Sequence, residues 1–228
     1  MDQTNQGIFI TFEGSEGCGK TTQFERLERR FAAEPATAGR RLVTLREPGG
    51  TPVGEEIRRL LKRTAPGWSV VPEAELLLFA ASRAQLVRTV INPLLAGGAL
   101  VMCDRFLDST TVYQGIARGL DPAAVAAINE FAAGPLRPDI TFLLDLPTDV
   151  ALARLHSRTL WANLPPDRME LELPAFYEGV RAGYLRLAAR HGERFVRIDA
   201  SQAPEEIEAE IWQNLTERFH GFRTLPGV

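Results

Sequence analysis

The amino-acid sequence predicts an α/β fold in which a parallel sheet is covered by helices on both of its faces. Short apolar runs alternate along the chain with longer segments that suit helices. The apolar runs are continuous rather than alternating with polar residues, which is typical of strands buried on both faces of a parallel sheet. A glycine-rich segment, residues 14–21, joins the first of these strands to the first helix.

Five predicted strands share the same character, a short apolar run that ends at a polar residue or a turn-rich loop. They cover residues 7–12, 41–46, 99–103, 139–145 and 195–198. Ligands of open α/β sheets bind at the carboxyl ends of the strands. The polar residues that follow these strands are therefore the first candidates for a functional site.

Helices are expected between the strands. One begins at about residue 21, others cover about 53–62 and 122–132, and the last begins near residue 204. The segment 73–95 is long and apolar on most of its faces, so we expect it to form a buried helix.

Composition limits the number of domains and the kinds of partner. The chain has 228 residues, 45% of them hydrophobic, and a formal net charge of -3. This suits a single α/β domain over residues 1–228 with a small lid. The nearly neutral charge gives no indication of a nucleic-acid or anionic membrane partner.

The chain shows no apolar run of membrane-spanning length, and its polar start does not resemble a signal peptide. Cys18 and Cys103 are its two cysteines. A disulfide framework is therefore not expected, and we predict a cytoplasmic protein.

Residues 14–21 read G-S-E-G-C-G-K-T and match the phosphate-loop pattern G-x-x-x-x-G-K-[ST] at every fixed position. In such a loop, backbone N–H groups and a helix N-terminus point into one concavity that suits an anion. Lys20 can then reach terminal phosphates and the Thr21 hydroxyl can bind Mg²⁺. The residues expected to bind the phosphates are Gly14, Ser15, Glu16, Gly17, Cys18, Gly19, Lys20, Thr21 and Thr22.

A phosphate loop occurs in GTPases, motor ATPases and small-molecule kinases. No Asn is followed by Lys here and no Asp has Gly three residues later, so the segments that a GTPase normally needs are missing. A motor ATPase usually has an acidic pair at its second key strand, where this chain has Asp104-Arg105. An arginine beside the aspartate suits a second anionic substrate, so phosphoryl transfer to an acceptor is favoured.

Several segments together resemble the bacterial thymidylate kinases. In chain order they are Phe12–Gln23, Arg46–Thr51, Leu78–Arg83, Asp104–Thr110 with Tyr113–Gly115, and Arg137–Asp139. The resemblance extends from about Gly7 to the final helix. It implies a phosphate-loop kinase fold with strand order 2-3-1-4-5, and transfer of the γ-phosphoryl group of ATP to dTMP with Mg²⁺. It also implies a homodimer and an adenine site near residues 199–202.

The resemblance assigns roles to individual residues. Lys20, Glu16, Asp104 and Arg105 would be catalytic, and Thr21 and Asp104 would be linked to the metal. Phe79 and Arg83 are four residues apart on one helix face, which suits stacking on a pyrimidine beside hydrogen bonds to its edge. The expected dTMP-binding residues are Glu16, Arg46, Phe79, Arg83, Arg105, Ser109, Tyr113 and Gln114.

The predicted lid covers about residues 154–172. Some family members carry an arginine just after the acidic residue of the phosphate loop, whereas this chain has Gly17 there. The resemblance then places the catalytic arginines in the lid, and Arg158 and Arg168 are the candidates. Residues 161–166 depart from the family because they form a proline-containing insert.

Three alternatives stay open. The protein could be a kinase of the same fold for another nucleotide or a deoxynucleoside, or a nucleotide-binding protein without turnover. A hydrolytic motor is the third alternative. A nucleoside acceptor would leave Arg46 and Arg105 without an anion to bind.

Overall fold

The computed structural model describes residues 7–34, 40–162 and 166–219, with the side chains of residues 159–162 excepted. Five parallel strands form one sheet in the order β2-β3-β1-β4-β5, which confirms the predicted topology. Their bounds are β1 (Ile8–Glu13), β2 (Leu42–Arg46), β3 (Leu100–Asp104), β4 (Ile140–Asp145) and β5 (Phe195–Asp199).

The helices connect the strands and begin where the sequence provides a starting signal. Six of them have proline at one of their first two positions. In the five that follow a loop rather than another helical segment, the missing N–H of proline leaves no bond unmade. The described helices are α1 (Lys20–Ala33), α2 (Pro52–Lys62), α3 (Pro72–Leu86), α4 (Asn92–Ala96), α5 (Leu107–Thr110), α6 (Pro122–Ala133), α7 (Thr148–Ala162), α8 (Pro174–Arg190) and α9 (Pro204–Arg218), with π-helical segments η3 (Val87–Ile91) and η4 (Thr111–Ala117).

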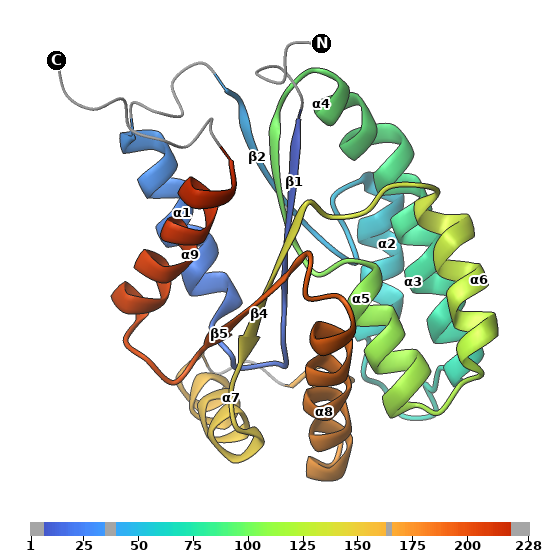
Figure 1. The fold of residues 1–228 in the computed structure, drawn as a ribbon. Helices are drawn as coiled ribbons and strands as arrows, with labels where there is room; N and C mark the ends of the chain where they lie inside the picture. Colours follow the sequence, from blue (N-terminus) through green and yellow to red (C-terminus); the bar gives the residue numbers. More distant parts are fainter. Residues whose placement is uncertain (1–6, 35–39, 163–165, 220–228) are drawn as a thin grey trace, which may run out of the picture.

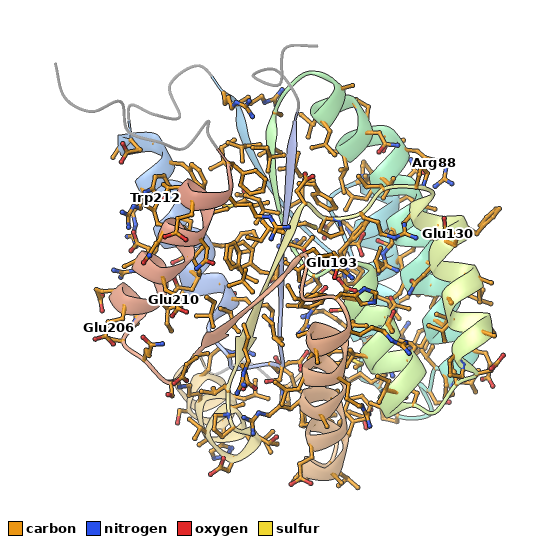
Figure 2. All side chains as sticks on the ribbon, viewed as in Figure 1. Arg88, Glu130, Glu193, Glu206, Glu210 and Trp212 are labelled. Carbon is orange, nitrogen blue, oxygen red and sulfur yellow. The ribbon has the colours of Figure 1, made fainter. Side chains whose placement is uncertain are left out.

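Helices cover both faces of the sheet, as Figure 1 shows. Helices α1 and α9 lie on one face, and α2, α3 and α6 lie on the other. Trp212 of α9, labelled in Figure 2, packs edge-on against Phe31 of α1 with ring centroids 5.1 Å apart. Buried apolar side chains therefore fill the layer on each side of the sheet.

Strands β1 and β4 are buried along their whole length, whereas the edge strands β2 and β5 are partly accessible. The continuous apolar runs in the sequence therefore mark the central strands.

The segment 73–95 departs from the expectation of one uniformly buried helix. Its winding passes from α3 through η3 into α4, and Leu77 of α3 is 56% exposed. Apolar residues on most faces of a helix do not reveal which face another element of the same chain covers.

The carboxyl ends of the strands lie at the bottom of Figure 1, beside α7 and α8. Here the loops continue the hydrogen bonding of the sheet. Glu47 N donates to Asp104 O at 2.9 Å, and Arg105 N donates to Phe12 O at 3.0 Å. The residues that follow β1, β2 and β3 are thereby fixed next to one another.

None of the helices in the described part of the chain is long and apolar enough to cross a membrane.

Candidate active site

A cavity of about 720 Å³ opens at this edge of the sheet, between the phosphate loop, the loops after β2 and β3, and the lid segment. Most of the predicted site residues line it together. They are Glu16, Gly17, Gly19, Lys20, Thr21, Thr22, Arg46, Phe79, Asp104, Arg105, Ser109, Tyr113, Gln114 and Arg158. Gly14, Ser15, Cys18, Arg83 and Arg168 are outside this lining.

The phosphate loop has the backbone that its glycines allow. Gly14, Gly17 and Gly19 have φ values of 138°, 77° and 95°, which residues with a Cβ rarely adopt. A Cβ on Gly17 would also lie 2.4 Å from the carbonyl oxygen of Ala151 in α7. Glycine at position 17 therefore lets the loop approach α7 closely.

Lys20 spans the interior of this loop. Its Nζ donates to Gly14 O at 3.1 Å and to Ser15 O at 2.9 Å, and the residue is buried. The only other hydrogen bond of this amine to the described residues goes to Cys18 Sγ at 3.5 Å. The amine is thus held at the mouth of an anion-binding loop, at the start of α1.

Arg105 has a strained backbone. Its φ is 69°, the one positive value outside glycine in the described chain, and such a conformation persists only when the surroundings hold it. Nη2 donates to Glu16 Oε1 at 2.8 Å and Nη1 donates to Ser109 Oγ at 3.1 Å. The guanidinium also lies over the ring of Tyr113, 5.0 Å from its centroid.

Glu16 links three parts of the site. Besides Arg105 after β3, it binds Tyr113 of η4, whose hydroxyl donates to Glu16 Oε2 at 2.7 Å. Burial raises the pKa of Tyr113 well above its usual range, so the phenol remains a hydrogen-bond donor.

Glu13 is a residue that the sequence reasoning missed. It is fully buried at the end of β1 and accepts hydrogen bonds from Phe106 N, Ser109 N, Ser109 Oγ and Tyr184 OH. Burial, and secondarily the charge of Asp108, raises its pKa. Glu13 fixes the turn that follows the strained Arg105. An acidic residue that ends an otherwise apolar strand was the signal that could have identified it.

Asp104 ends β3 and faces the cavity. Its Oδ1 is buried and has no hydrogen-bond partner among the described residues, which is costly unless a ligand or ion satisfies it. Thr21 lines the same cavity and is exposed in the first turn of α1. An orphaned carboxylate oxygen and a hydroxyl are hard oxygen donors of the kind that Mg²⁺ prefers. The residues therefore fit a magnesium ion accompanied by phosphate and water.

Within the described chain no group of three or more His, Cys, Asp or Glu residues forms a metal cage.

Arg83 occupies a different place from the one expected. It is 1% exposed and donates to Glu47 Oε2 at 2.8 Å, Asn129 Oδ1 at 2.8 Å, and both Phe106 O and Thr110 Oγ1. Phe79, four residues earlier, does line the cavity. The spacing of four residues puts both on one face of α3, but the partners that hold Arg83 outside the cavity lining come from three other segments.

Glu47 forms part of the cavity wall and pairs with Arg83. Burial raises its pKa to about 7, although the charge and hydrogen bond of Arg83 act in the opposite direction. Its second oxygen, Oε1, is buried without a hydrogen-bond partner among the described residues. The structure thus places Glu47, whose role the sequence left open, as a buried carboxyl in the wall of the cavity.

Two further arginines, Arg46 and Arg58, lie close together in the cavity wall. Arg46 is held by Glu55 at 3.1 Å, and Arg58, which the sequence reasoning missed, donates to Pro48 O at 2.9 Å. Burial and then the neighbouring Arg46 lower the pKa of Arg58. Like charges gathered in one wall suit an anionic group of the ligand.

The lid segment is docked on the body of the protein. Lys62 pairs with Asp167 at 2.6 Å. Burial acts to raise the pKa of Asp167, but the hydrogen bond and charge of Lys62 lower it overall. Arg158 pairs with Glu170 and lines the cavity. Arg168 instead pairs with the buried Glu75 and donates to Leu61 O. The predicted insert lies mostly outside the described residues or their side chains.

The loop after β5 lies beside α7. Arg154 of α7 donates to Ala200 O at 3.1 Å. Residues 199–202, the segment expected near adenine, do not line the cavity.

Comparisons with known proteins point to one family. A family model described as thymidylate kinase matches residues 12–211. A thymidylate kinase of Geotalea uraniireducens is 46% identical over 206 residues, covering 90% of this chain and 94% of that protein. Another from Deinococcus radiodurans is 44% identical and covers 95% of this chain and 100% of that protein.

A solved structure has the same fold. The crystal structure of thymidylate kinase from Ehrlichia chaffeensis superimposes with a TM-score of 0.70 at 30% identity, covering 92% of this chain and 99% of that one. Family model, relatives and structure agree over nearly the whole chain. The chain therefore belongs to the thymidylate kinase family.

Proposed function

We propose that the cavity binds ATP and dTMP side by side and that its residues transfer the γ-phosphoryl group of ATP to dTMP, giving ADP and dTDP. Membership of the thymidylate kinase family defines this nucleoside monophosphate kinase reaction, a step in dTTP biosynthesis. One observation supports the arrangement of the two substrates. Lys20 of the phosphate loop and Arg105 after β3 line the same cavity, so two anion-binding groups face one space.

On the donor side, the phosphate loop and the N-terminus of α1 would bind the β- and γ-phosphates. Lys20 would turn from the loop carbonyls to the phosphate oxygens. Mg²⁺, held by Thr21 and Asp104, would neutralise phosphate charge when it is bound. Adenine would extend beyond the cavity lining, between α7 and residues 199–202, which the bond from Arg154 to Ala200 O brings together.

On the acceptor side, Arg46, Arg58 and Arg105 would bind the phosphate of dTMP, and Phe79 would stack on its base. Glu16 would accept from the 3′-hydroxyl, since its carboxylate already gathers Arg105 and Tyr113 in the cavity. Arg83 is outside the cavity lining and would support the base site from behind by holding Glu47, which lines the cavity.

The lid, over about residues 154–172, would close over the phosphates. Arg158 is the better placed of the two predicted lid arginines because it lines the cavity, whereas Arg168 is bound to Glu75. Charge from Arg158 would then stabilise the transferring phosphoryl group.

The test is ADP release with ATP and Mg²⁺ against dTMP, dUMP, dCMP, UMP, dGMP and thymidine. Preferential turnover of dTMP is the expected result. Turnover of another monophosphate would overturn the base assignment but keep the mechanism. Binding of ATP without any acceptor-dependent turnover would contradict the proposal.

We also propose a homodimer that buries the face formed by α2, α3 and α6, which lie side by side in Figure 1. Leu60, Leu77 and Phe131 are 40%, 56% and 82% exposed on these helices, and such apolar side chains favour an interface. Light scattering should give twice the monomer mass, and L77R should reduce it. A matched L171R variant on the lid segment should remain dimeric.

A cytoplasmic location and a single functional domain over residues 1–228 complete the proposal. Cys18 and Cys103 are both free and buried, which suits a reducing compartment. Cell fractionation tests the location.

A further inference from the structure

A buried carboxylate lies directly behind the acceptor side of the cavity. Glu75 of α3 is 0% exposed, yet it is outside the cavity lining and has no part in the roles proposed above. Its neighbours are the side chains of Gln114, Arg118 and Arg168. Burying a carboxylate carries a large desolvation cost, which these partners offset, so removing any one of them leaves the charge less well satisfied.

Glu75 determines which end of the Gln114 amide is available to a ligand. Gln114 Nε2 donates to Glu75 Oε1 at 2.7 Å. A carboxylate only accepts hydrogen bonds, so the amide nitrogen must face Glu75 and the amide oxygen must point elsewhere. Gln114 Oε1 makes no hydrogen bond to the residues that the structure describes, and Gln114 lines the cavity.

Two arginines keep Glu75 a hydrogen-bond acceptor toward Gln114. Arg118 contacts both of its oxygens, at 3.3 and 3.4 Å, and Arg168 lies at 2.5 Å from Oε2. Arg118 is itself held by Glu172 and stacks on Phe176. Paired with two guanidinium groups, Glu75 remains an acceptor, so the Gln114 amide cannot turn over without losing a charge-assisted bond.

The chemistry of pyrimidines gives this orientation a consequence. Thymine and uracil carry a hydrogen on N3, whereas N3 of cytosine is an acceptor. An amide oxygen in the cavity accepts from the former and opposes the lone pair of the latter. A buried polar group that is left unpaired by the wrong ligand is a strong source of discrimination.

We infer that Glu75 is a positioning residue for base specificity, which orients Gln114 so that the cavity selects pyrimidine monophosphates bearing a hydrogen on N3. The inference rests on the proposed placement of the acceptor base beside Gln114. Glu75 does not line the cavity itself and acts on the ligand only through the Gln114 amide that it holds.

The test compares kcat/KM for dTMP and for 5-methyl-dCMP, which share the 5-methyl group and the size of the ring. Wild type should prefer dTMP by more than about tenfold. In E75Q the side chain can either donate or accept, so the Gln114 amide is free to turn. The preference should then fall by about tenfold, chiefly through loss of dTMP turnover.

Three variants separate positioning from general support. E75D keeps the charge for both arginines but shortens the reach to Gln114, so the preference should fall here even if E75Q folds poorly. E172Q removes a carboxylate from the same Arg118 without touching Gln114, and should keep the wild-type preference. In a Q114M background, E75Q should change the preference no further.

Each contrary result has one meaning. Equal turnover of the two substrates by wild type, or an unchanged preference in folded E75Q and E75D, would overturn the inference while dTMP kinase activity stands. A further fall in preference when E75Q is added to Q114M would assign Glu75 a purely structural effect. Failure of wild type to phosphorylate any pyrimidine monophosphate would instead overturn the proposed function.

Discussion

The two sides of the cavity are built in different ways. The phosphate loop is a single continuous segment, and its shape follows from glycines at positive φ and from the helix that begins at Lys20. The proposed acceptor side is assembled from β2, α3, β3, η4 and the lid, and Arg83, buried behind it, is bound by side chains from distant segments. A local motif can therefore define the donor site, whereas the acceptor site depends on long-range pairing.

This difference predicts that variants on the two sides fail differently. Substitutions of phosphate-loop residues that touch the ligand should affect turnover with little effect on stability. Substitutions of buried residues behind the proposed acceptor side, such as Arg83, should affect stability first, because the partners of these residues are other parts of the protein.

The largest effect is expected for K20M in the phosphate loop. Loss of the amine removes charge stabilisation of the transferring phosphoryl group, so kcat should fall by roughly 10²–10³-fold. The thermal midpoint should change little, because the described partners of the amine are loop carbonyls and a thiol. Steady-state kinetics and calorimetry on the same preparation check both parts. A large loss of stability with normal turnover would break the comparison.

R83M should show the opposite pattern. Removing the guanidinium leaves Glu47 and Asn129 without their buried partner, and breaking a buried pair costs about 3 kcal/mol of unfolding free energy. Urea denaturation measures this loss. Arg88 is exposed on the same helical run, so R88M is a suitable control and should lose much less free energy of unfolding. Wild-type stability in R83M would mean that the buried network contributes nothing.

Glu47 should make stability depend on pH. Because burial raises its pKa from 4.5 to about 7, the folded protein holds a proton that the unfolded chain has released. The contribution of Glu47 to the free energy of unfolding should therefore be fully present below about pH 4.5. It should be lost as the pH rises through about 7, a decrease of up to about 3 kcal/mol.

The measurement is urea denaturation at pH 5 and pH 8. E47Q should lack this part of the decrease, so the difference between the two pH values should be smaller in the variant than in wild type. An equal decrease in both proteins would contradict the assignment of the raised pKa to Glu47.

The lid arginines should differ from each other. R158A should lower kcat by roughly tenfold to a hundredfold with little change in dTMP binding, because Arg158 lines the cavity. R168A should act chiefly by releasing Glu75, and so should lower the preference for dTMP more than kcat. Kinetics with titrated dTMP distinguish the two, and unchanged turnover in both variants would exclude a catalytic role for lid arginines.

The smallest effect is expected for C18A. The Cys18 side chain is buried against the loop and contacts Lys20 only at 3.5 Å. Loss of one sulfur atom should cost about 1 kcal/mol of stability or less, and kcat should stay within about twofold of wild type. A hundredfold loss of turnover would show that the thiol takes part in the chemistry.

Much of the fold could be predicted because it depends on local patterns. Buried strands appear as continuous apolar runs, prolines mark the starts of helices, and the glycine loop has a fixed spacing. The exposed face of α3 could not be predicted, since an apolar helix does not indicate which of its sides is covered.

The sequence by itself determined the strand–loop–helix unit around Lys20, and its motifs identified the family and the reaction. Only the tertiary structure decided the acceptor wall, where Glu13 holds the turn after Arg105 and Glu75 holds Gln114. The physical reason is that backbone conformation and periodicity are local properties of a sequence. The partner of a buried charge is chosen by packing among segments far apart in the chain.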